Sequence, residues 1–453
     1  MFSAYLNCYK IPELRKRLLI TFGLVALCRL VCFIPCPGVD PTELSKILGN
    51  LAGPQGQNGL LDVMNMFSGG AMEKFAIGAL GIMPYISASI ILQLMTPVIP
   101  QLERMMREGE SGRQKYNQMM KYVTLVICFI QGGMFAYSMA NVNGGESVQV
   151  ADMGVGFIIM TIISLTAGAM LVMWLGEMIT ERGIGNGASI IITVNIIARL
   201  PGALASLIKL VLSGTMVGDA EITPVHLVIL LALFFMVTAG AIALTQGHRK
   251  IPVCYAARRM SGVGQTTSVQ TSYLPLRVNY SGVMPIIFAG AILSFPMMLM
   301  RFLPNSWLVG KLASLLQHGS GSYVFLYGLM ILVFSFFWVA NQFNPIQIAD
   351  DLQKQSGYIP SIQPGTPTAE FLDHAMTRIT FAGAIFLTVL AVFPMVLSNA
   401  LNINAQIAQF FGGTSLLIIV GVGLDTLRQI ESYLLARHYD GFMEKGKIRS
   451  RRG

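Results

Sequence analysis

Ten long apolar stretches run through this 453-residue sequence, and they limit the possible folds more than any other feature. They cover residues 18–36, 77–97, 119–140, 154–175, 184–201, 225–245, 281–301, 323–343, 378–399 and 412–433. A transmembrane helix needs about 20 apolar residues, and 184–201 is the shortest of the ten. Only 12% of the residues are charged, against about 25% in soluble domains. No stretch has the period-two alternation of barrel strands. The sequence predicts an all-α multispan membrane protein with ten transmembrane helices.

The basic residues predict how these helices are oriented in the membrane. If the N-terminus is cytosolic, the cytosolic segments hold 24 of the 31 Lys and Arg residues and the outer segments hold six, while Arg29 lies within the first span. Cytosolic segments normally carry this excess, so we expect both termini in the cytosol. The first span is followed by IPCPG rather than by a small-residue cleavage site, so we expect a signal anchor and no cleaved signal peptide.

One apolar phrase occurs twice in the chain. GIMPYISASIIL (81–92) and GVMPIIFAGAIL (282–293) share seven letters, and GASIII (187–192) is echoed more weakly by GTSLLI (413–418). Spans 2 and 5 therefore match spans 7 and 10 in order. Because five crossings separate the matched spans, the second half is inverted relative to the first. This pattern is typical of inverted repeats with a site near the midplane; chance similarity between apolar helices is the alternative.

The repeat also predicts the domain organisation. We expect a cytosolic N-terminus at 1–17, a first five-helix half at 18–201, a second half at 202–433 and a basic cytosolic tail at 434–453. Pro84 and Pro285 should each remove a backbone donor within a span and loosen its helix. One loosened helix in each half favours a seam that opens, although ordinary kinks in a static bundle would look the same.

Isoleucines, rather than charged residues, mark the centres of the matched spans. Spans 2, 3, 7 and 8 have no ionisable side chain at their centres, where a coupled transporter usually has a carboxylate. Ile86 matches Ile287, Ile192 matches Ile418, and Ile82 lies one helical turn before Ile86. A ring of branched apolar side chains can close a pore by dewetting. Core packing explains any single isoleucine equally well.

Three segments outside the spans have unusual properties. LLDVMNMFSGGAMEKF (60–75) is too short to cross a membrane, and we interpret it as a re-entrant helix or an outer amphipathic loop helix. The cytosolic connections 246–280 and 344–377 are longer than most loops. A long, basic cytosolic surface favours an anionic partner such as RNA or an acidic protein, while the positive-inside rule explains its charge but not its length.

The sequence has no recognisable catalytic or cofactor site. It lacks a phosphate-binding GxxxxGK[ST] loop, an HExxH pair and a paired-cysteine metal pattern. Cys28, Cys32 and Cys36 lie on one helical stripe, and without a nearby histidine we expect them to pack as small apolar residues rather than to bind a metal. We therefore expect no enzyme activity, no cofactor and no metal.

Several motifs resemble those of the SecY family, the channel subunits of Sec protein translocases. The resemblance runs from about residue 10 to the C-terminus. It is carried by MFSGGA, ALGIMPYISASIILQL, GEMITERGIGNGASIII, YLPLRVNYSGVMPIIFA, FNPIQIADDLQKQSG, MTRIT and FGGTSLLIIVGVGLDTLRQIES. These motifs in this order are highly specific for the family.

The resemblance implies a pore, a plug, a lateral gate and a docking site. The implied pore ring is Ile82, Ile86, Ile192, Ile287 and Ile418. The implied outer plug helix is 60–71, with Leu60, Met64, Phe67, Gly69 and Gly70. The implied lateral gate, between spans 2 and 3 and spans 7 and 8, contains Pro84, Ile90, Gln93, Gln131, Pro285 and Ala291. The implied cytosolic docking residues are Arg249, Lys250, Arg258, Arg259 and Gln363.

The resemblance also implies partners and a location. The partners are small single-span SecE-like and SecG-like subunits, a SecA motor ATPase or the ribosome, signal peptides with their nascent chains, and membrane lipid. The location is the bacterial cytoplasmic (inner) membrane. Two motifs depart from the family: PSIQPG has Gln363 where relatives usually have arginine, and SGVGQ (261–265) lacks the basic pair that some members carry. These departures concern docking and leave the pore unchanged.

Three functions are compatible with these features. The first is a passive protein-conducting channel that also releases transmembrane segments sideways into lipid. The second is an inverted-repeat secondary transporter of a small solute, which the missing central carboxylates disfavour. The third is an insertase or scaffold without a pore, which the plug-like segment and the paired gate disfavour.

Overall fold

Ten helices of the computed structural model coincide with the ten predicted spans. The structure describes residues 11–39, 67–140, 155–213, 224–255, 270–300, 307–316, 320–400 and 414–445. The ten helices are α2 (Pro12–Val31), α5 (Met83–Met95), α7 (Glu110–Ala140), α8 (Val155–Arg182), α9 (Gly187–Ser213), α10 (Pro224–Gln246), α11 (Met284–Met300), α13 (Gly321–Gln342), α15 (Thr366–Ala400) and α17 (Thr414–Lys445). The predicted fold class, an all-α multispan membrane protein, is confirmed.

The described helices differ in how well they would cross a membrane on their own. By length and composition, segments of α7, α8, α10, α13 and α15 pass as spans, and a sixth passes if α5 is joined to α6 (Pro100–Arg107) across a 105° bend. α9 and α11 contain shorter apolar helices at 187–202 and 284–294. α9 packs against α8, α17 and α2, and α11 packs against α13, α5 and α12 (Trp307–Leu316), so protein covers part of the surface of each.

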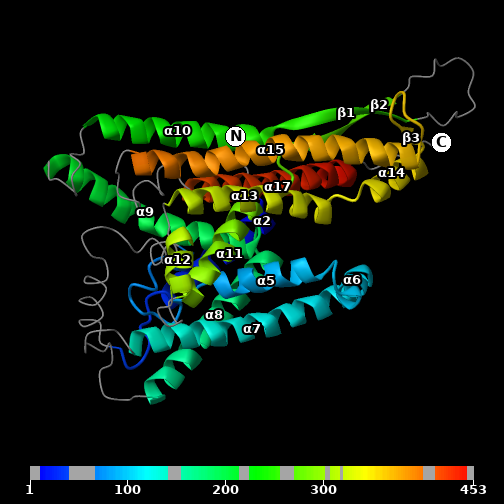
Figure 1. Ribbon diagram of the computed structural model, residues 1–453. Coiled ribbons are helices and arrows are strands. Elements are labelled where there is room, and N and C mark those ends of the chain that lie inside the picture. Colours follow the sequence, from blue (N-terminus) through cyan, green and yellow to red (C-terminus); the bar gives the residue numbers. More distant parts are fainter. Residues whose placement is uncertain are drawn as a thin grey trace, which may run out of the picture.

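The helices form two groups that meet along two helix pairs. Figure 1 shows α5, α7 and α8 in one group and α10, α13, α15 and α17 in the other. The main contacts between the groups are α5 with α11 and α9 with α17. These are the two pairs of helices that carry the repeated phrases, so the matched sequences face each other. The predicted boundary after residue 201 falls inside α9, which continues to Ser213.

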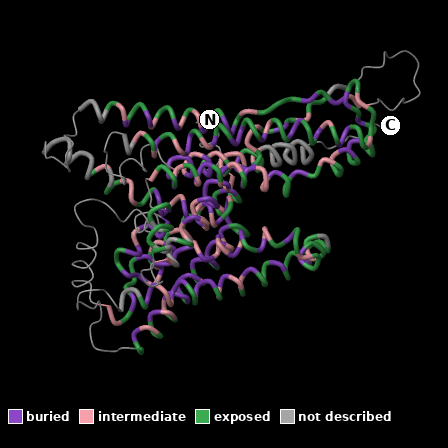
Figure 2. Tube along the Cα trace, viewed as in Figure 1, coloured by how far each residue is buried: buried purple, intermediate pink, exposed green. Residues whose placement is uncertain are grey.

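Exposure follows the pattern expected of a protein surrounded by lipid. The outer faces of both groups carry large exposed apolar side chains, including Phe22, Ile163, Phe235, Phe325 and Phe381. Figure 2 shows that the buried residues concentrate where the groups meet, while exposed residues follow the outer helices. Soluble proteins rarely expose so much contiguous apolar surface, which agrees with a membrane environment.

A small sheet and a short helix extend the second group at one end (Figure 1). β1 (His248–Tyr255) pairs antiparallel with β2 (Gln270–Arg277) and with β3 (Gly357–Tyr358), in the order β2-β1-β3. Ile251 and Val253 of β1 pack against Leu372 of α15, together with α14 (Pro345–Lys354). The two long connections therefore fold as one unit. A last described helix, α12 (Trp307–Leu316), lies between α11 and α13 in the chain.

Candidate functional site

The repeated phrase has the same backbone conformation in both halves. Gly81 and Gly282 both have positive φ, at 56° and 62°, a region that glycine adopts without the steric cost of a Cβ. The helices begin two residues later, at Met83 and Met284. The sequence repeat is thus also a repeat of local structure, and it places each helix start next to the centre of the molecule.

The two prolines of the phrase occupy a different place from the one we predicted. We expected Pro84 and Pro285 to loosen their helices from within. Instead, each is the second residue of its helix. A first-turn N–H has no partner within the helix, so proline costs little there and its fixed φ favours the helical start. The prolines therefore define where α5 and α11 begin and do not kink them.

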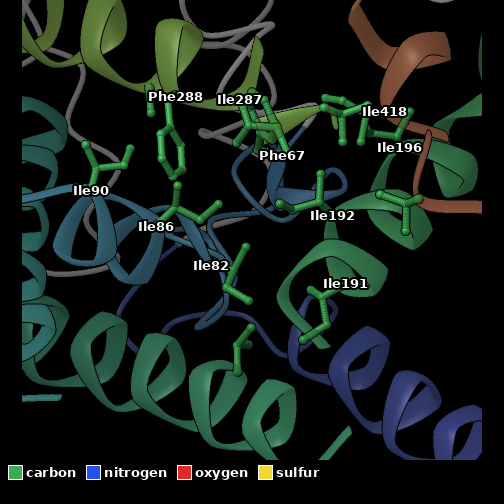
Figure 3. Packing of buried hydrophobic residues seen from close by; sticks show 14 of the residues in the cluster. Phe67, Ile82, Ile86, Ile90, Ile191, Ile192, Ile196, Ile287, Phe288 and Ile418 are labelled. Atoms are coloured by element: carbon green, nitrogen blue, oxygen red, sulfur yellow. The ribbon is translucent and has the colours of Figure 1, made fainter. Parts of the chain in front are cut away.

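The five predicted ring isoleucines come together in one buried cluster, here called the central cluster. Ile82 and Ile86 come from the start of α5, Ile192 from α9, Ile287 from α11 and Ile418 from α17. Each is at most 5% exposed. Figure 3 shows these side chains directed toward a shared interior region, which is formed by helices from both groups. Four helices thus contribute isoleucines to one buried apolar cluster where the two halves meet.

Phe67 lies within the same cluster, although it precedes α5 by sixteen residues. Its ring is buried with the isoleucines, and Figure 3 shows it beside Ile287. Gly69 and Gly70 follow with φ of +67° and +87° and turn the chain away from this position. Leu60 and Met64, the other predicted plug residues, lie outside the described residues. The described end of the predicted plug therefore contributes one large aromatic side chain to the central cluster.

Several cluster members were not predicted. They are Val172, Leu175, Ile179, Ile191, Ile196, Val283, Phe288, Phe334 and Val422. One of them had a usable signal: Val283 is the residue that matches Ile82 in the repeated phrase. Ile196 follows Ile192 by one helical turn, so the same face of α9 supplies both. Phe334 of α13 has no counterpart in the repeat, and only the packing reveals it.

The seam between α5 and α11 contains some, but not all, of the predicted gate residues. Ile90 and Ala291 match each other in the repeat, and both are buried in the central cluster. Gln93 lies on the same face of α5 as Ile86 and Ile90. Its Nε2 donates a hydrogen bond to Ser89 Oγ at 3.0 Å, while its Oε1 is buried without a partner among the described residues. The seam therefore combines buried apolar contacts with one polar side chain, Gln93, which is hydrogen-bonded within its own helix.

Gln131 lies away from this seam. It shares a face of α7 with Cys128 and Phe135, which pack against Leu165 of α8 within the first group. The side chain of Gln131 is buried. The structure does not bring it to the contact between α5 and α11, and its role in a gate stays a prediction.

Two polar side chains near Phe67 had no predicted function. Arg29 of α2 donates hydrogen bonds from Nη1 to the Gly69 carbonyl oxygen at 3.1 Å and to Asn195 Oδ1 at 3.2 Å. Asn195 of α9 donates from Nδ2 to the Phe67 carbonyl oxygen at 2.8 Å. Arg29 was visible in the sequence as a charge inside the first span, which is itself a signal of function. Asn195 gave no signal, because a single amide in a helix is common.

The predicted docking residues lie on the sheet and the loop after it. Arg249 and Lys250 are both exposed at the start of β1; Lys250 lies on the opposite face from Ile251 and Val253, and Arg249 precedes them on the same face. Gln363 is exposed in the turn before α15, where its carbonyl oxygen accepts a hydrogen bond from Thr368 Oγ1 at 2.8 Å. Arg258 and Arg259 lie outside the described residues. The described basic side chains are free to contact a partner in solution.

The cysteine stripe packs as apolar residues do. Cys28 belongs to the central cluster, Cys32 contacts Ala71 and Ala76, and Cys36 lies with Phe75 and Phe157. Within the described segments, no group of three His, Cys, Asp or Glu side chains could hold a metal ion. The three thiols therefore line the contact of α2 with the residues that lead into α5.

Comparison with known proteins gives matches over most of the chain. The family model for SecY matches residues 76–427. The chain is 39% identical to the protein translocase subunit SecY of Chlamydia muridarum, with 98% of each chain covered. It is 38% identical to the protein translocase subunit SecY of Thermotoga maritima, with 100% of each covered.

Solved structures show the same fold at lower identity. A protein conducting channel aligns with a TM-score of 0.61 and 17% identity, covering 94% of this chain and 96% of that one. Sec61 in the canine ribosome–channel complex from the endoplasmic reticulum aligns with a TM-score of 0.58 and 17% identity, again covering 94% and 96%. The range matched by the family contains the whole isoleucine ring and both repeated phrases. The chain belongs to the SecY family.

Proposed function

We propose that this chain is the central, pore-forming subunit of a protein-conducting channel. It moves unfolded secretory proteins across the membrane and releases transmembrane segments sideways into lipid. The single observation that carries this proposal is the meeting of five isoleucines, from four helices of two inverted halves, with Phe67 in one buried cluster. The chain is a channel subunit and not an enzyme.

The composition of the constriction supports gating without a coupled ion. A narrow collar of branched aliphatic side chains excludes water and ions because a dry apolar passage cannot solvate them. The same side chains can separate to admit an extended polypeptide, since no hydrogen bond or ion pair joins them. A solute transporter would need polar groups that bind its substrate, whereas the side chains at the five ring positions and at Phe67 are all apolar.

The arrangement of the halves supports a lateral exit at the seam of α5 and α11. The buried residues that meet there, such as Ile90 and Ala291, are apolar, and the hydrogen bond of Gln93 to Ser89 stays within α5, so separating the two helices leaves that bond intact. Lipid can replace the lost apolar contacts, because lipid tails are as apolar as the side chains. We therefore place the lateral gate at Ile90, Gln93 and Ala291, with Pro84 and Pro285 at the helix starts.

Translocation into vesicles tests the proposal directly. The chain, purified with the small subunits that remain bound to it, is reconstituted into liposomes together with a SecA-type motor ATPase and ATP. A precursor with a functional signal sequence should become protected from added protease, and the same precursor without its signal should not. Equal protection of both, or of neither in vesicles that contain correctly inserted protein, would contradict the proposal.

We further propose that the sheet and α14 face the cytosol of a bacterium and receive the ribosome or a motor ATPase, with both termini on the same side. The basic residues of the loops support this orientation, and the solved canine relative was determined in a ribosome complex. Small single-span subunits and signal peptides complete the expected set of partners. The inner membrane is the proposed location.

Reversing two charges should weaken ribosome binding. Arg249→Glu with Lys250→Glu removes two cations that face solvent on β1. Each contact between a cation and a nucleic-acid phosphate contributes about 0.7–0.9 to the slope of log affinity against log salt, so we expect the slope to fall by about 1.5. Ribosome binding is measured by co-sedimentation with inside-out vesicles at several salt concentrations.

The matched control is Lys311→Glu on α12, which changes an exposed charge in the connection between spans 7 and 8 that we assign to the outer side. It should leave ribosome binding unchanged. Vesicles of the opposite orientation should not bind ribosomes. An unchanged salt slope in the double variant, or binding to the outer face, would contradict this docking surface or its orientation.

A further inference from the structure

Three consecutive backbone carbonyl groups, those of Phe67, Ser68 and Gly69, are each held by a side chain from a neighbouring helix. Asn195 Nδ2 donates to the first at 2.8 Å, Cys32 Sγ donates to the second at 3.6 Å, and Arg29 Nη1 donates to the third at 3.1 Å. Arg29 also donates to Asn195 Oδ1 at 3.2 Å, so the two polar side chains orient each other. We call the pair of Arg29 and Asn195 the anchor.

The anchor lies where polar side chains are expensive. Arg29 is within the first span and Asn195 is in the middle of α9, where its side chain is buried. Charged residues in such positions usually serve a function, because their desolvation is unfavourable. One contribution is to satisfy the carbonyls of a non-helical segment inside the membrane. That contribution alone does not explain why Phe67, the first residue of this segment, places its ring in the central cluster.

Phe67 connects the anchor to the proposed pore. Its carbonyl is bound by Asn195, and its ring is packed among the isoleucines of the central cluster. Asn195 also follows Ile192 by three residues and precedes Ile196 by one, so α9 contributes both to the ring and to the anchor. The backbone of 67–69 cannot leave its place on α2 and α9 without breaking these hydrogen bonds, and Phe67 cannot leave the cluster without moving that backbone.

We propose that Arg29 and Asn195 are positioning residues that hold Phe67 in the constriction and thereby set how easily the channel opens. This inference rests on the proposed channel function. Both side chains belong to the first group of helices, on α2 and α9, so they fix Phe67 to that group and leave the second group free to move. Weakening the anchor should release Phe67, favour the open state and relax the requirement for a strong signal sequence.

Two adjacent glycines provide a matched pair of variants. A Cβ at Gly69 would clash with Arg29 Nη1 and lie 2.8 Å from Asn195 Oδ1, whereas a Cβ at Gly70 would meet nothing within 4 Å. Both residues have positive φ, so alanine causes backbone strain at either position. Only Gly69→Ala also displaces the anchor, and the end of the Arg29 side chain can swing away without disturbing the helices. The difference between the two variants therefore isolates the anchor from the strain.

Cys32 is a natural reporter of whether this segment has moved. Its thiol is buried against Ser68 and packs with Ala71 and Ala76. Departure of 67–69 would expose it to a hydrophilic thiol reagent added to the outer side of membrane vesicles. Peptide mass mapping separates the modified Cys32 from the other five cysteines of the chain. This measurement needs neither a translocation substrate nor a partner.

We expect Asn195→Ala and Gly69→Ala to increase the rate of Cys32 modification roughly tenfold, which corresponds to about 1.4 kcal/mol. Gly70→Ala should increase it much less. Arg29→Lys keeps one donor and the charge, and should fall between the wild type and Arg29→Met. The same variants, in the same order, should increase export of a reporter that carries a defective signal sequence. A loss of packing alone would lower export instead.

Three results would overturn the inference in different ways. If all variants accumulate normally and Cys32 reactivity is unchanged, the hydrogen bonds only satisfy local carbonyls. If Gly70→Ala matches Gly69→Ala, strain rather than the anchor controls the segment. If Cys32 becomes reactive but export of the defective reporter rises only with Ile192→Asn, the anchor does not control opening although the channel function stands. Failure of the channel itself would appear as no effect of Ile192→Asn.

Discussion

Replacing Ile192 with asparagine is expected to make the closed channel leak small ions and pass precursors with defective signal sequences. Ile192 is 2% exposed in the central cluster. Burial of an isoleucine side chain contributes roughly 1.5–3 kcal/mol relative to exposure. An amide in its place has no partner among apolar neighbours, which costs about another 1–3 kcal/mol. The open state, in which the pore is hydrated, would lose none of this free energy, so the substitution destabilises only the closed state.

The expected shift between closed and open states is therefore large. A change of about 3 kcal/mol alters the ratio roughly 100-fold, since each 1.4 kcal/mol is a factor of ten. Two measurements report the ratio of open to closed channels: ion conductance in planar bilayers, and export of a reporter that carries a defective signal sequence. Ile418→Asn and Ile287→Asn should act in the same direction, because they change the ring from α17 and α11.

The control lies on the same helix. Ile197 of α9 is 44% exposed and lies outside the central cluster. Ile197→Asn places the same amide on the outer face of the helix and should lower protein accumulation without raising conductance. If the Ile192 variant accumulates normally but behaves like the wild type in both assays, the isoleucines are ordinary core residues.

Joining α5 to α11 is expected to abolish translocation. Ile90 and Ala291 occupy matched positions on these helices, and both are buried in the central cluster. Cysteines at the two positions should therefore crosslink readily in the resting state with a short bifunctional thiol reagent. Because a lateral exit requires these helices to separate, the crosslinked protein should lose nearly all transport, and a cleavable crosslinker should allow its recovery.

A crosslink within one group of helices provides the comparison. Leu80 and Leu165 pack together among α8 and the residues that precede α5, so joining them restrains no contact between the groups. This pair should crosslink equally well and retain transport. Full activity with a complete Ile90–Ala291 crosslink would show that the seam does not open at this point.

The repeat was the most informative feature of the sequence. It predicted correctly that two distant phrases adopt one local structure, and Gly81 and Gly282 share a left-handed backbone conformation for that reason. It also selected four isoleucines, to which helical spacing added Ile82, and the structure brings all five together. Val283 could have been added by the same alignment. The repeat succeeds because two inverted halves that meet at an axis bring equivalent positions together.

Other elements escaped the sequence analysis for identifiable physical reasons. β1 and β2 give little signal in the sequence, since HRKIPVCY and QTSYLPLR are short and each contains a proline, and β3, which pairs with β1, lies far away in the chain. The spans expected at 77–97 and 281–301 begin before the helices do, at Met83 and Met284. Pro84 and Pro285 therefore look like interruptions within a helix in the sequence, although each lies at a helix start. Residues 77–82 are non-helical turns, which apolar composition cannot distinguish from helix.

The sequence by itself determined the membrane class, the ten helices and the pairing of the two halves. Each of these follows from patterns that are local or repeated: apolar length, the distribution of basic residues and the shared phrase. Only the tertiary structure decided that Phe67 enters the ring, that Gln131 faces away from the seam, and that Arg29 and Asn195 hold the backbone of 67–69. The hydrogen bond between Arg29 and Asn195, for example, joins residues 166 positions apart. Which of these distant residues touch depends on how helices of different sequence pack, and no local pattern in the sequence specifies that packing.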